Sequence, residues 1–127
     1  MSAAAFAAIG VGAAFGAWSR WGLGLLLNHV FPTLPLGTLV ANLLGGYLIG
    51  LTLGALSHFE VLSPELRLLV TTGFLGSLTT FSTFSAEAST LISRDQYGWA
   101  AAHVGAHLAG SLLLTFAGIA TMRLILR

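Results

Sequence analysis

Apolar residues gather in four long stretches joined by short connections: residues 3–27, 36–56, 66–92 and 99–126. A helix needs roughly 20 residues to cross about 30 Å of hydrocarbon, and each stretch reaches that length. The pattern therefore predicts an all-α integral membrane protein. We expect residues 1–127 to form a single four-helix transmembrane domain. We also expect the protein to be a multi-pass protein of the cell membrane.

The connection before the third stretch contains the helix-start sequence Ser63-Pro64-Glu65. Serine is a favoured N-cap, proline is tolerated at the first helical position, and glutamate is stabilised by the positive end of the helix dipole. We expect the third helix to begin here.

The composition supports a membrane protein and removes several other classes. Only 7% of the residues are charged, whereas soluble domains have about 25%. The net charge of +1 offers no basic surface for nucleic acid. Because the chain has no cysteine, disulfides and thiolate metal sites are excluded. No basic residue precedes the first apolar stretch, so we expect that stretch to belong to the mature protein rather than to a signal peptide.

The arginines give only a weak orientation signal. With four crossings, Arg67, Arg123 and Arg127 lie on one side of the membrane. Arg94 lies on the other side, joined by Arg20 if that side chain snorkels toward the first connection. Either another feature sets the orientation, or the chain inserts in both directions and forms an antiparallel dimer.

Glycines recur at helical spacing in the first two stretches. Gly12 and Gly16 are four residues apart, and so are Gly46, Gly50 and Gly54 along the second stretch. Small residues at this spacing let helix backbones approach closely. We interpret them as packing faces.

The third stretch is unusually polar for a membrane segment. Residues 71–85 contain eight serines and threonines together with Gly73 and Gly76. Hydroxyls in a helix often bond back to their own backbone, which accounts for a few of them but poorly for eight. Glycines with hydroxyls favour a helix broken near the bilayer midplane, where exposed backbone groups can hold ions.

Two phenylalanines follow within the same segment. Phe81 and Phe84 lie three residues apart, on one face of a helix. Ordinary core packing is one interpretation. The other uses the positive edge of the aromatic ring, which, beside hydroxyl and amide donors, makes a weak site for a small anion.

The other polar residues of the apolar stretches have open interpretations. Asn42 is either an interhelical hydrogen-bonding residue or a donor aimed into a pore. Arg20 and Glu87 are either structural or functional. His107, Ser111 and Thr115 share one helix face and could form a polar track. His103 and His107 have the spacing of a metal-binding pair, but the sequence shows no second ligand pair nearby. No hydrolase or phosphate-loop signature is present, so we do not expect an enzyme.

Two motifs resemble the signatures of the CrcB/Fluc family of fluoride channels. They are residues 37–43, GTLVANL, and residues 72–87, TGFLGSLTTFSTFSAE. The second motif is long and specific, and the resemblance covers essentially the whole chain. It implies an antiparallel, dual-topology homodimer whose third helices are broken. It also implies a central structural sodium ion held by backbone carbonyls of Gly76 and Thr79 from both subunits.

The resemblance further implies two pores along the dimer interface that pass fluoride in preference to chloride and export it from the cytoplasm. Arg20 and Glu87 would support the pore, and His107 stands where a small polar residue is expected. The implied pore residues are Asn42, Thr80, Phe81, Ser82, Phe84, Ser85, Ser111 and Thr115.

Two rival functions remain open from the residues themselves. A small proton-coupled exporter would need a central carboxylate, for which Glu87 is the intramembrane candidate. A non-transporting assembly subunit would use the glycine faces to bind partner helices.

Overall fold

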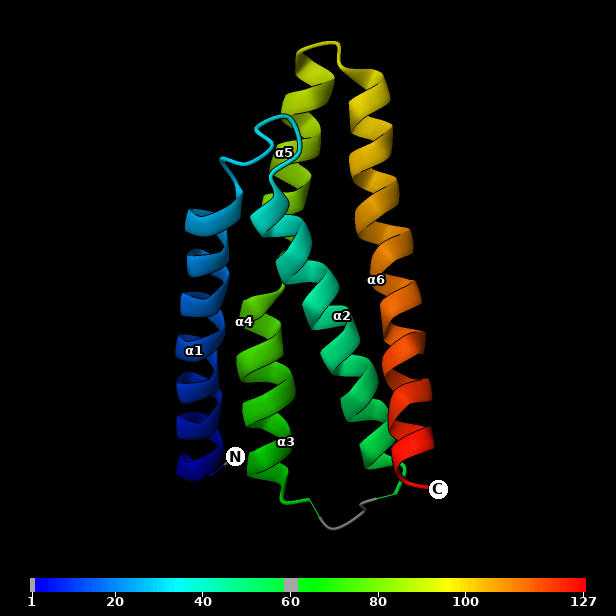
Figure 1. Ribbon diagram of the computed structural model, residues 1–127. Coiled ribbons are helices and arrows are strands. Elements are labelled where there is room, and N and C mark those ends of the chain that lie inside the picture. Colours follow the sequence, from blue (N-terminus) through cyan, green and yellow to red (C-terminus); the bar gives the residue numbers. More distant parts are fainter. Residues whose placement is uncertain (1, 59–61) are drawn as a thin grey trace.

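The computed structural model describes residues 2–58 and 62–127, and the regular elements of this part of the chain are all helices. They lie side by side as four rods, the third of which is interrupted (Figure 1). In chain order they are α1 (Ala3–Leu27), α2 (Leu36–Leu56), α3 (Pro64–Leu68), the π-helical η1 (Leu69–Leu75), α4 (Gly76–Leu78), α5 (Phe81–Ser93) and α6 (Tyr97–Ile125). The all-α prediction is confirmed.

The rods are arranged as repeated membrane crossings require. The start of α1, the end of α2, the start of α3 and the end of α6 lie at one end of the bundle, and the connections after α1 and α5 lie at the opposite end (Figure 1). Among the described helices, α2 and α6 are long and apolar enough to span a membrane. α1 has 25 residues but contains Arg20, and the third rod is divided into shorter pieces.

The third rod begins where the sequence predicts. The Ser63 hydroxyl accepts a hydrogen bond from the Leu66 N–H at 3.2 Å, Pro64 is the first helical residue, and Glu65 lies in the first turn. The cap satisfies one of the unpaired amides at the helix start.

The predicted break in the third rod is confirmed, but the glycines do not form it. Thr79 (φ −87°, ψ 157°) and Thr80 (φ −150°, ψ 122°) are extended and separate α4 from α5. Gly73 lies inside η1, and Gly76 is helical with φ −62° and ψ −30°. The two glycines therefore have another role, and the break depends on contacts made at Thr79 and Thr80.

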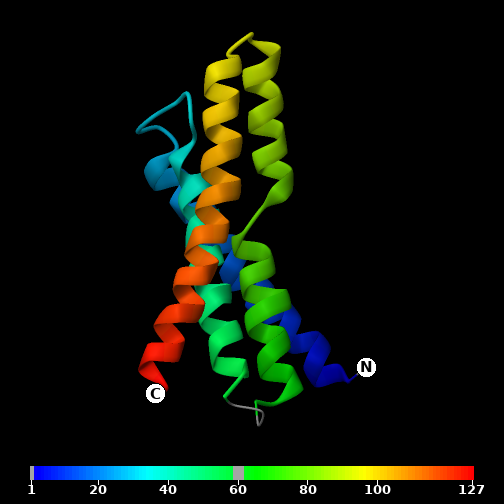
Figure 2. The same cartoon turned by 90° about the vertical axis from the view of Figure 1, so that its right-hand side faces the viewer.

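The break allows the two halves of the third rod to pack against different partners. η1 and α4 contact α1, whereas α5 contacts α6, and α2 packs along α6 (Figure 2). A continuous helix could not follow both neighbours in this way. The interruption thus lies between α1, α2 and α6, well away from both ends of the bundle.

The predicted glycine packing faces are confirmed. A Cβ at Gly12 or Gly16 would collide with the backbone of η1 at Leu69 and Phe74, and at Gly16 also with that of α4 at Leu78. A Cβ at Gly46 would lie 2.9 Å from the Ser111 carbonyl oxygen on α6. Gly73 faces Gly12 across the α1 contact. These positions lack a side chain because two backbones meet there.

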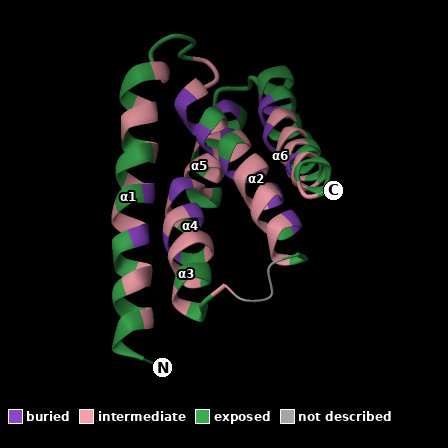
Figure 3. Cartoon of the chain, turned by 60° about the horizontal axis from the view of Figure 1, so that its bottom comes forward, coloured by how far each residue is buried: buried purple, intermediate pink, exposed green. Residues whose placement is uncertain are grey.

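The buried residues face the middle of the bundle, and the outward faces remain exposed (Figure 3). Large apolar side chains are among the most exposed, including Phe6 at 81%, Phe116 at 68% and Trp21 at 67%. Such surfaces are unfavourable in water and favourable in lipid or against another protein. The exposure agrees with a membrane protein.

Candidate functional site

A cavity of about 520 Å³ opens beside the break in the third rod. Its walls come from α2, from both sides of the break and from α6. Residues from all of these elements meet in it. They include His107 and eight of the twelve residues predicted for the pore, the sodium ion or their support: Asn42, Gly76, Thr79, Thr80, Phe81, Phe84, Ser111 and Thr115. The other four of these twelve, Arg20, Ser82, Ser85 and Glu87, lie outside its lining.

The side chain of Asn42 holds the broken backbone. The Thr80 N–H donates to Asn42 Oδ1 at 2.8 Å, and Asn42 Nδ2 donates to the Thr80 carbonyl oxygen at 3.0 Å. Asn42 Nδ2 also lies 3.0 Å from Nδ1 of His107. The Asn42 amide thus supplies hydrogen-bond partners to the backbone N–H and carbonyl of Thr80, where the helix is interrupted. This is the interhelical hydrogen-bonding role that was considered from the sequence.

The same contacts free two carbonyl oxygens from helical hydrogen bonding. In a continuous helix the Thr80 N–H would donate to Gly76, but it donates to Asn42. The Thr83 N–H would donate to Thr79, but it donates to the Thr80 hydroxyl at 3.1 Å. Gly76 and Thr79 both line the cavity. Their carbonyl oxygens therefore lack the donor that an α-helix supplies.

Arg20 reaches the end of α4 and does not snorkel toward the first connection. Its Nε donates to the Ser77 carbonyl oxygen at 3.0 Å. The last carbonyls of a helix carry partial negative charge, which a guanidinium stabilises. The contacts therefore support a structural role for Arg20 at the end of α4. Arg20 does not add to the arginines on the side of the membrane where Arg94 lies.

The two phenylalanines lie together at the start of α5. Their ring centroids are 5.6 Å apart with the planes tilted by 49°. Phe81 is 79% exposed, so it is not a core residue of this chain. Phe84 stacks on the imidazole of His103 at 5.3 Å and 18°, and its centroid lies 4.8 Å from that of His107. Stacking covers part of the Phe84 face.

The hydroxyls around the cavity differ in whether they are already hydrogen-bonded within the chain. The Thr115 hydroxyl is committed to backbone, since it lies 3.0 Å from the Gly46 carbonyl and 2.9 Å from the Ser111 carbonyl. Ser111 also lines the cavity, and its hydroxyl forms no such bond with the described residues. The Thr80 hydroxyl caps α5 and lies 3.3 Å from the exposed Ser82 hydroxyl.

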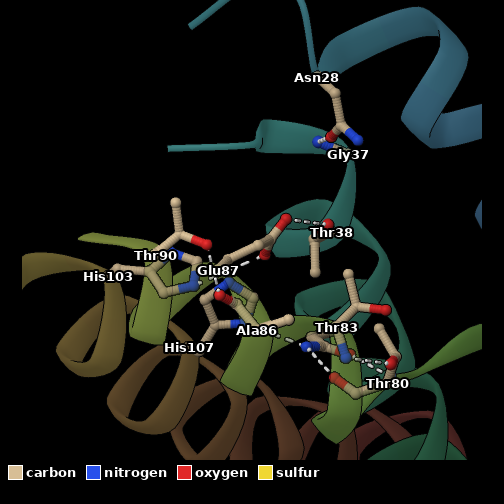
Figure 4. A network of polar contacts seen from close by, with 11 residues as sticks. Asn28, Gly37, Thr38, Thr80, Thr83, Ala86, Glu87, Thr90, His103 and His107 are labelled. Atoms are coloured by element: carbon tan, nitrogen blue, oxygen red, sulfur yellow. Dashed lines mark hydrogen bonds and ion pairs between the residues drawn. The ribbon is translucent and has the colours of Figure 1, made fainter. Parts of the chain in front are cut away.

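Glu87 lies one turn beyond Phe84, outside the main cavity. Its Oε2 accepts a hydrogen bond from the Thr38 hydroxyl at 2.9 Å, and its Oε1 lies 3.6 Å from Nε2 of His103 (Figure 4). It also lines a second cavity of about 240 Å³, together with Arg94 near the end of the bundle. Thr38 is a functional candidate that the sequence argument missed. The available signal was its position four residues before Asn42, on the same face of α2.

His103 and His107 occupy the space between Glu87 and the main cavity. Both are buried, at 2% and 5% exposure. The sequence offered no further metal ligand beside this pair, but the structure places Glu87 with them: one ligand atom from each residue lies within 4.8 Å of the others. These three residues are hereafter the Glu87–His103–His107 cluster.

Comparison with known proteins adds independent findings. Residues 7–119 match the family model described as CrcB-like protein, Camphor Resistance (CrcB). The chain is 59% identical over 116 residues to a protein of Aromatoleum aromaticum named fluoride-specific ion channel FluC, covering 91% of this chain and 88% of that one. It is 58% identical over 119 residues to a protein of the same name from Nitrosospira multiformis, with 94% and 93% covered. A third, from Ralstonia nicotianae, is 55% identical over 123 residues, with 97% and 98% covered.

Proposed function

Because the chain belongs to the CrcB-like family, we propose that it is a fluoride-selective ion channel that passively exports cytoplasmic fluoride across the cell's inner (plasma) membrane. The observation that carries the proposal is the high identity, over nearly the whole chain, to proteins named as fluoride-specific ion channels. The cavity at the break in the third rod supports it independently, since broken helices expose polar groups that hold ions inside a membrane.

The lining of this cavity suits a small anion that must both enter and leave. None of the lining residues is a lysine or arginine, so no fixed side-chain cation would trap the ion. The Ser111 hydroxyl, the start of α5 and the edges of Phe81 and Phe84 offer weak positive partners. Conduction requires binding of this moderate strength.

We further propose that the working unit is an antiparallel homodimer with two pores along its interface. Phe81 lines the cavity yet is 79% exposed, and Gly76 is exposed beside it. A pore through lipid must be closed on every side, because the bilayer core cannot satisfy polar groups. A second copy of the chain would provide the missing wall.

A structural sodium ion at the centre of that dimer is also proposed. The carbonyl oxygens of Gly76 and Thr79 have lost their helical donors and are suitable ligands for a hard cation. Two oxygens from one chain are too few to replace the hydration of the ion, so the ion would need the same two from a second copy. If bound, it would join the subunits and offset repulsion between anions in the nearby pores.

A proton-coupled exporter is the second candidate. The observation in its favour is the Glu87 carboxylate, 3.6 Å from the imidazole of His103 and inside the bundle. Intramembrane carboxylate–histidine pairs are typical of proton relays.

The test is efflux from liposomes that contain the purified protein, followed with fluoride and chloride electrodes in parallel. The channel predicts rapid fluoride release with little chloride release, at equal pH on both sides and with a protonophore present. A requirement for an imposed proton gradient would favour the exporter. A folded dimer that released neither ion, with or without an imposed proton gradient, would contradict both functions and favour an assembly subunit.

A further inference from the structure

We propose that the Glu87–His103–His107 cluster is a binding site for a divalent transition-metal ion such as Zn²⁺, and that an ion bound there closes the fluoride path. The binding stands on the geometry of this chain alone, whereas the closure rests on the proposed channel function. The cluster joins a carboxylate on α5 to two imidazoles four residues apart on α6.

The ligand types and their separations fit such an ion. Two histidines with one glutamate form a recurrent zinc set that leaves a fourth position open, and imidazole also suits nickel and copper. Ligands around a tetrahedral zinc ion lie about 3.4 Å apart, given bonds of about 2.1 Å. His103 Nε2 and Glu87 Oε1 are already 3.6 Å apart, and the widest separation in the cluster is at most 4.8 Å. Modest side-chain rotation closes the difference.

The atoms that would bind the metal are buried, and none of them has a hydrogen-bond partner among the described residues. Glu87 Oε1, His103 Nε2 and His107 Nε2 are shielded from solvent and form no hydrogen bond with the described residues. The two imidazoles are 2% and 5% exposed, and the other carboxylate oxygen is held by Thr38. Buried polar atoms normally have hydrogen-bond partners, so three that lack one, two of them 3.6 Å apart, indicate a ligand.

The hydrogen bond between Asn42 and His107 opposes metal binding, because a bound metal ion would break it. The Asn42 amide is oriented by Thr80, so its Nδ2 donates to His107 Nδ1 and the ring proton of neutral His107 is on Nε2. A metal at Nε2 would move that proton to Nδ1 and break the bond to Asn42. A single hydrogen bond is worth little beside a metal–imidazole bond, so the metal prevails, but the Asn42 contact is lost on binding.

The position of the cluster explains why an ion there would close the path. His107 lines the main cavity beside Phe84, and Glu87 lines the second cavity near Arg94. An ion held by both residues lies between the two spaces. A dication would also bind fluoride too strongly for release, which conduction does not tolerate.

Binding is tested by isothermal titration of Zn²⁺ into the intact protein, purified without a polyhistidine tag, with Mg²⁺ as the hard-cation control. One saturable zinc site per chain is expected, and none for Mg²⁺, which prefers oxygen ligands. The His103→Gln, His107→Gln double variant is expected to weaken zinc binding by at least about 100-fold. The matched control is His29→Gln, His58→Gln, which changes two exposed histidines outside the cluster and should leave binding unchanged.

Because the double variant alters buried residues, Glu87→Gln and a zinc-dependent rise in Tm provide a second measurement. Zinc should raise the Tm of the wild type and of the control but not of either cluster variant. Absence of saturable binding, or binding that survives the cluster substitutions, would overturn the site. For closure, Zn²⁺ should slow wild-type fluoride efflux at least tenfold; bound zinc without inhibition would overturn closure. Absence of fluoride efflux without zinc would instead refute the proposed function.

Discussion

Asn42 and Thr80 are joined by a pair of hydrogen bonds that replaces a missing turn of helix. The backbone N–H and carbonyl oxygen of Thr80 both bond to the side-chain amide of a residue 38 positions earlier, at 2.8 and 3.0 Å. The break in the third rod is thus maintained by α2. Since α2 also packs along α6, the same side chain links three walls of the cavity.

Replacing Asn42 by alanine is expected to destabilise the fold as well as the site. It leaves the Thr80 N–H and carbonyl unpaired in a low-dielectric interior, at a cost of about 2–4 kcal/mol. Thermal unfolding in detergent measures the loss. The matched control is Asn28→Ala, which removes one side-chain bond to the Gly37 N–H near the end of the bundle. That change should cost about 1 kcal/mol. Equal losses would show that the bridge to Thr80 is not special.

Gly12 is expected to tolerate no larger residue. In Gly12→Val the new side chain collides with the backbone of η1, which cannot move without displacing α1 or the break. A loss of at least about 2 kcal/mol is expected from overpacking. Gly10→Val is the control, because a Cβ at Gly10 meets nothing within 4 Å. Thermal unfolding of both variants checks this, and a Gly12→Val protein as stable as Gly10→Val would contradict the close α1 contact.

The proposed antiparallel dimer predicts which residue meets its own copy. Gly76 lies near the middle of the bundle, and an added Cβ there has only the Thr71 carbonyl near it, at 3.5 Å. The chain has no cysteine, so Gly76→Cys introduces a single thiol. A short thiol-reactive cross-linker should convert it to a covalent dimer in membranes. Gly10→Cys, in the first half of α1, should remain monomeric. Cross-linking at Gly10 without cross-linking at Gly76 would contradict an antiparallel dimer centred on Gly76.

Much of the fold is predictable because it depends on local signals. The expected first two spans coincide with α1 and α2, since apolar length decides where a helix can cross a membrane. Ser63 and Pro64 start the third rod as their local chemistry requires. The glycine faces were also readable, because their spacing alone places them on one side of a helix.

The details of the site depend on residues far apart in the sequence and were not predictable in the same way. Glycines suggested the break, yet it falls at Thr79 and Thr80 because Asn42 pairs with the backbone there. The contact between Thr38 and Glu87 joins α2 to α5 and leaves no local signal. Arg20 contacts Ser77 for the same reason, since only the folded chain shows where α4 ends.

We propose that fluoride passes the break in the third rod beside the edges of Phe81 and Phe84. The most direct measurement is fluoride efflux from liposomes with the Phe81→Ile, Phe84→Ile variant, which keeps apolar bulk but removes both ring edges. Efflux from this variant should be at least tenfold slower than from the wild type, while the dimer remains folded. Phe6→Ile, which alters a similarly exposed ring at the start of α1, should conduct like the wild type. Unchanged efflux in the double variant would contradict the claim.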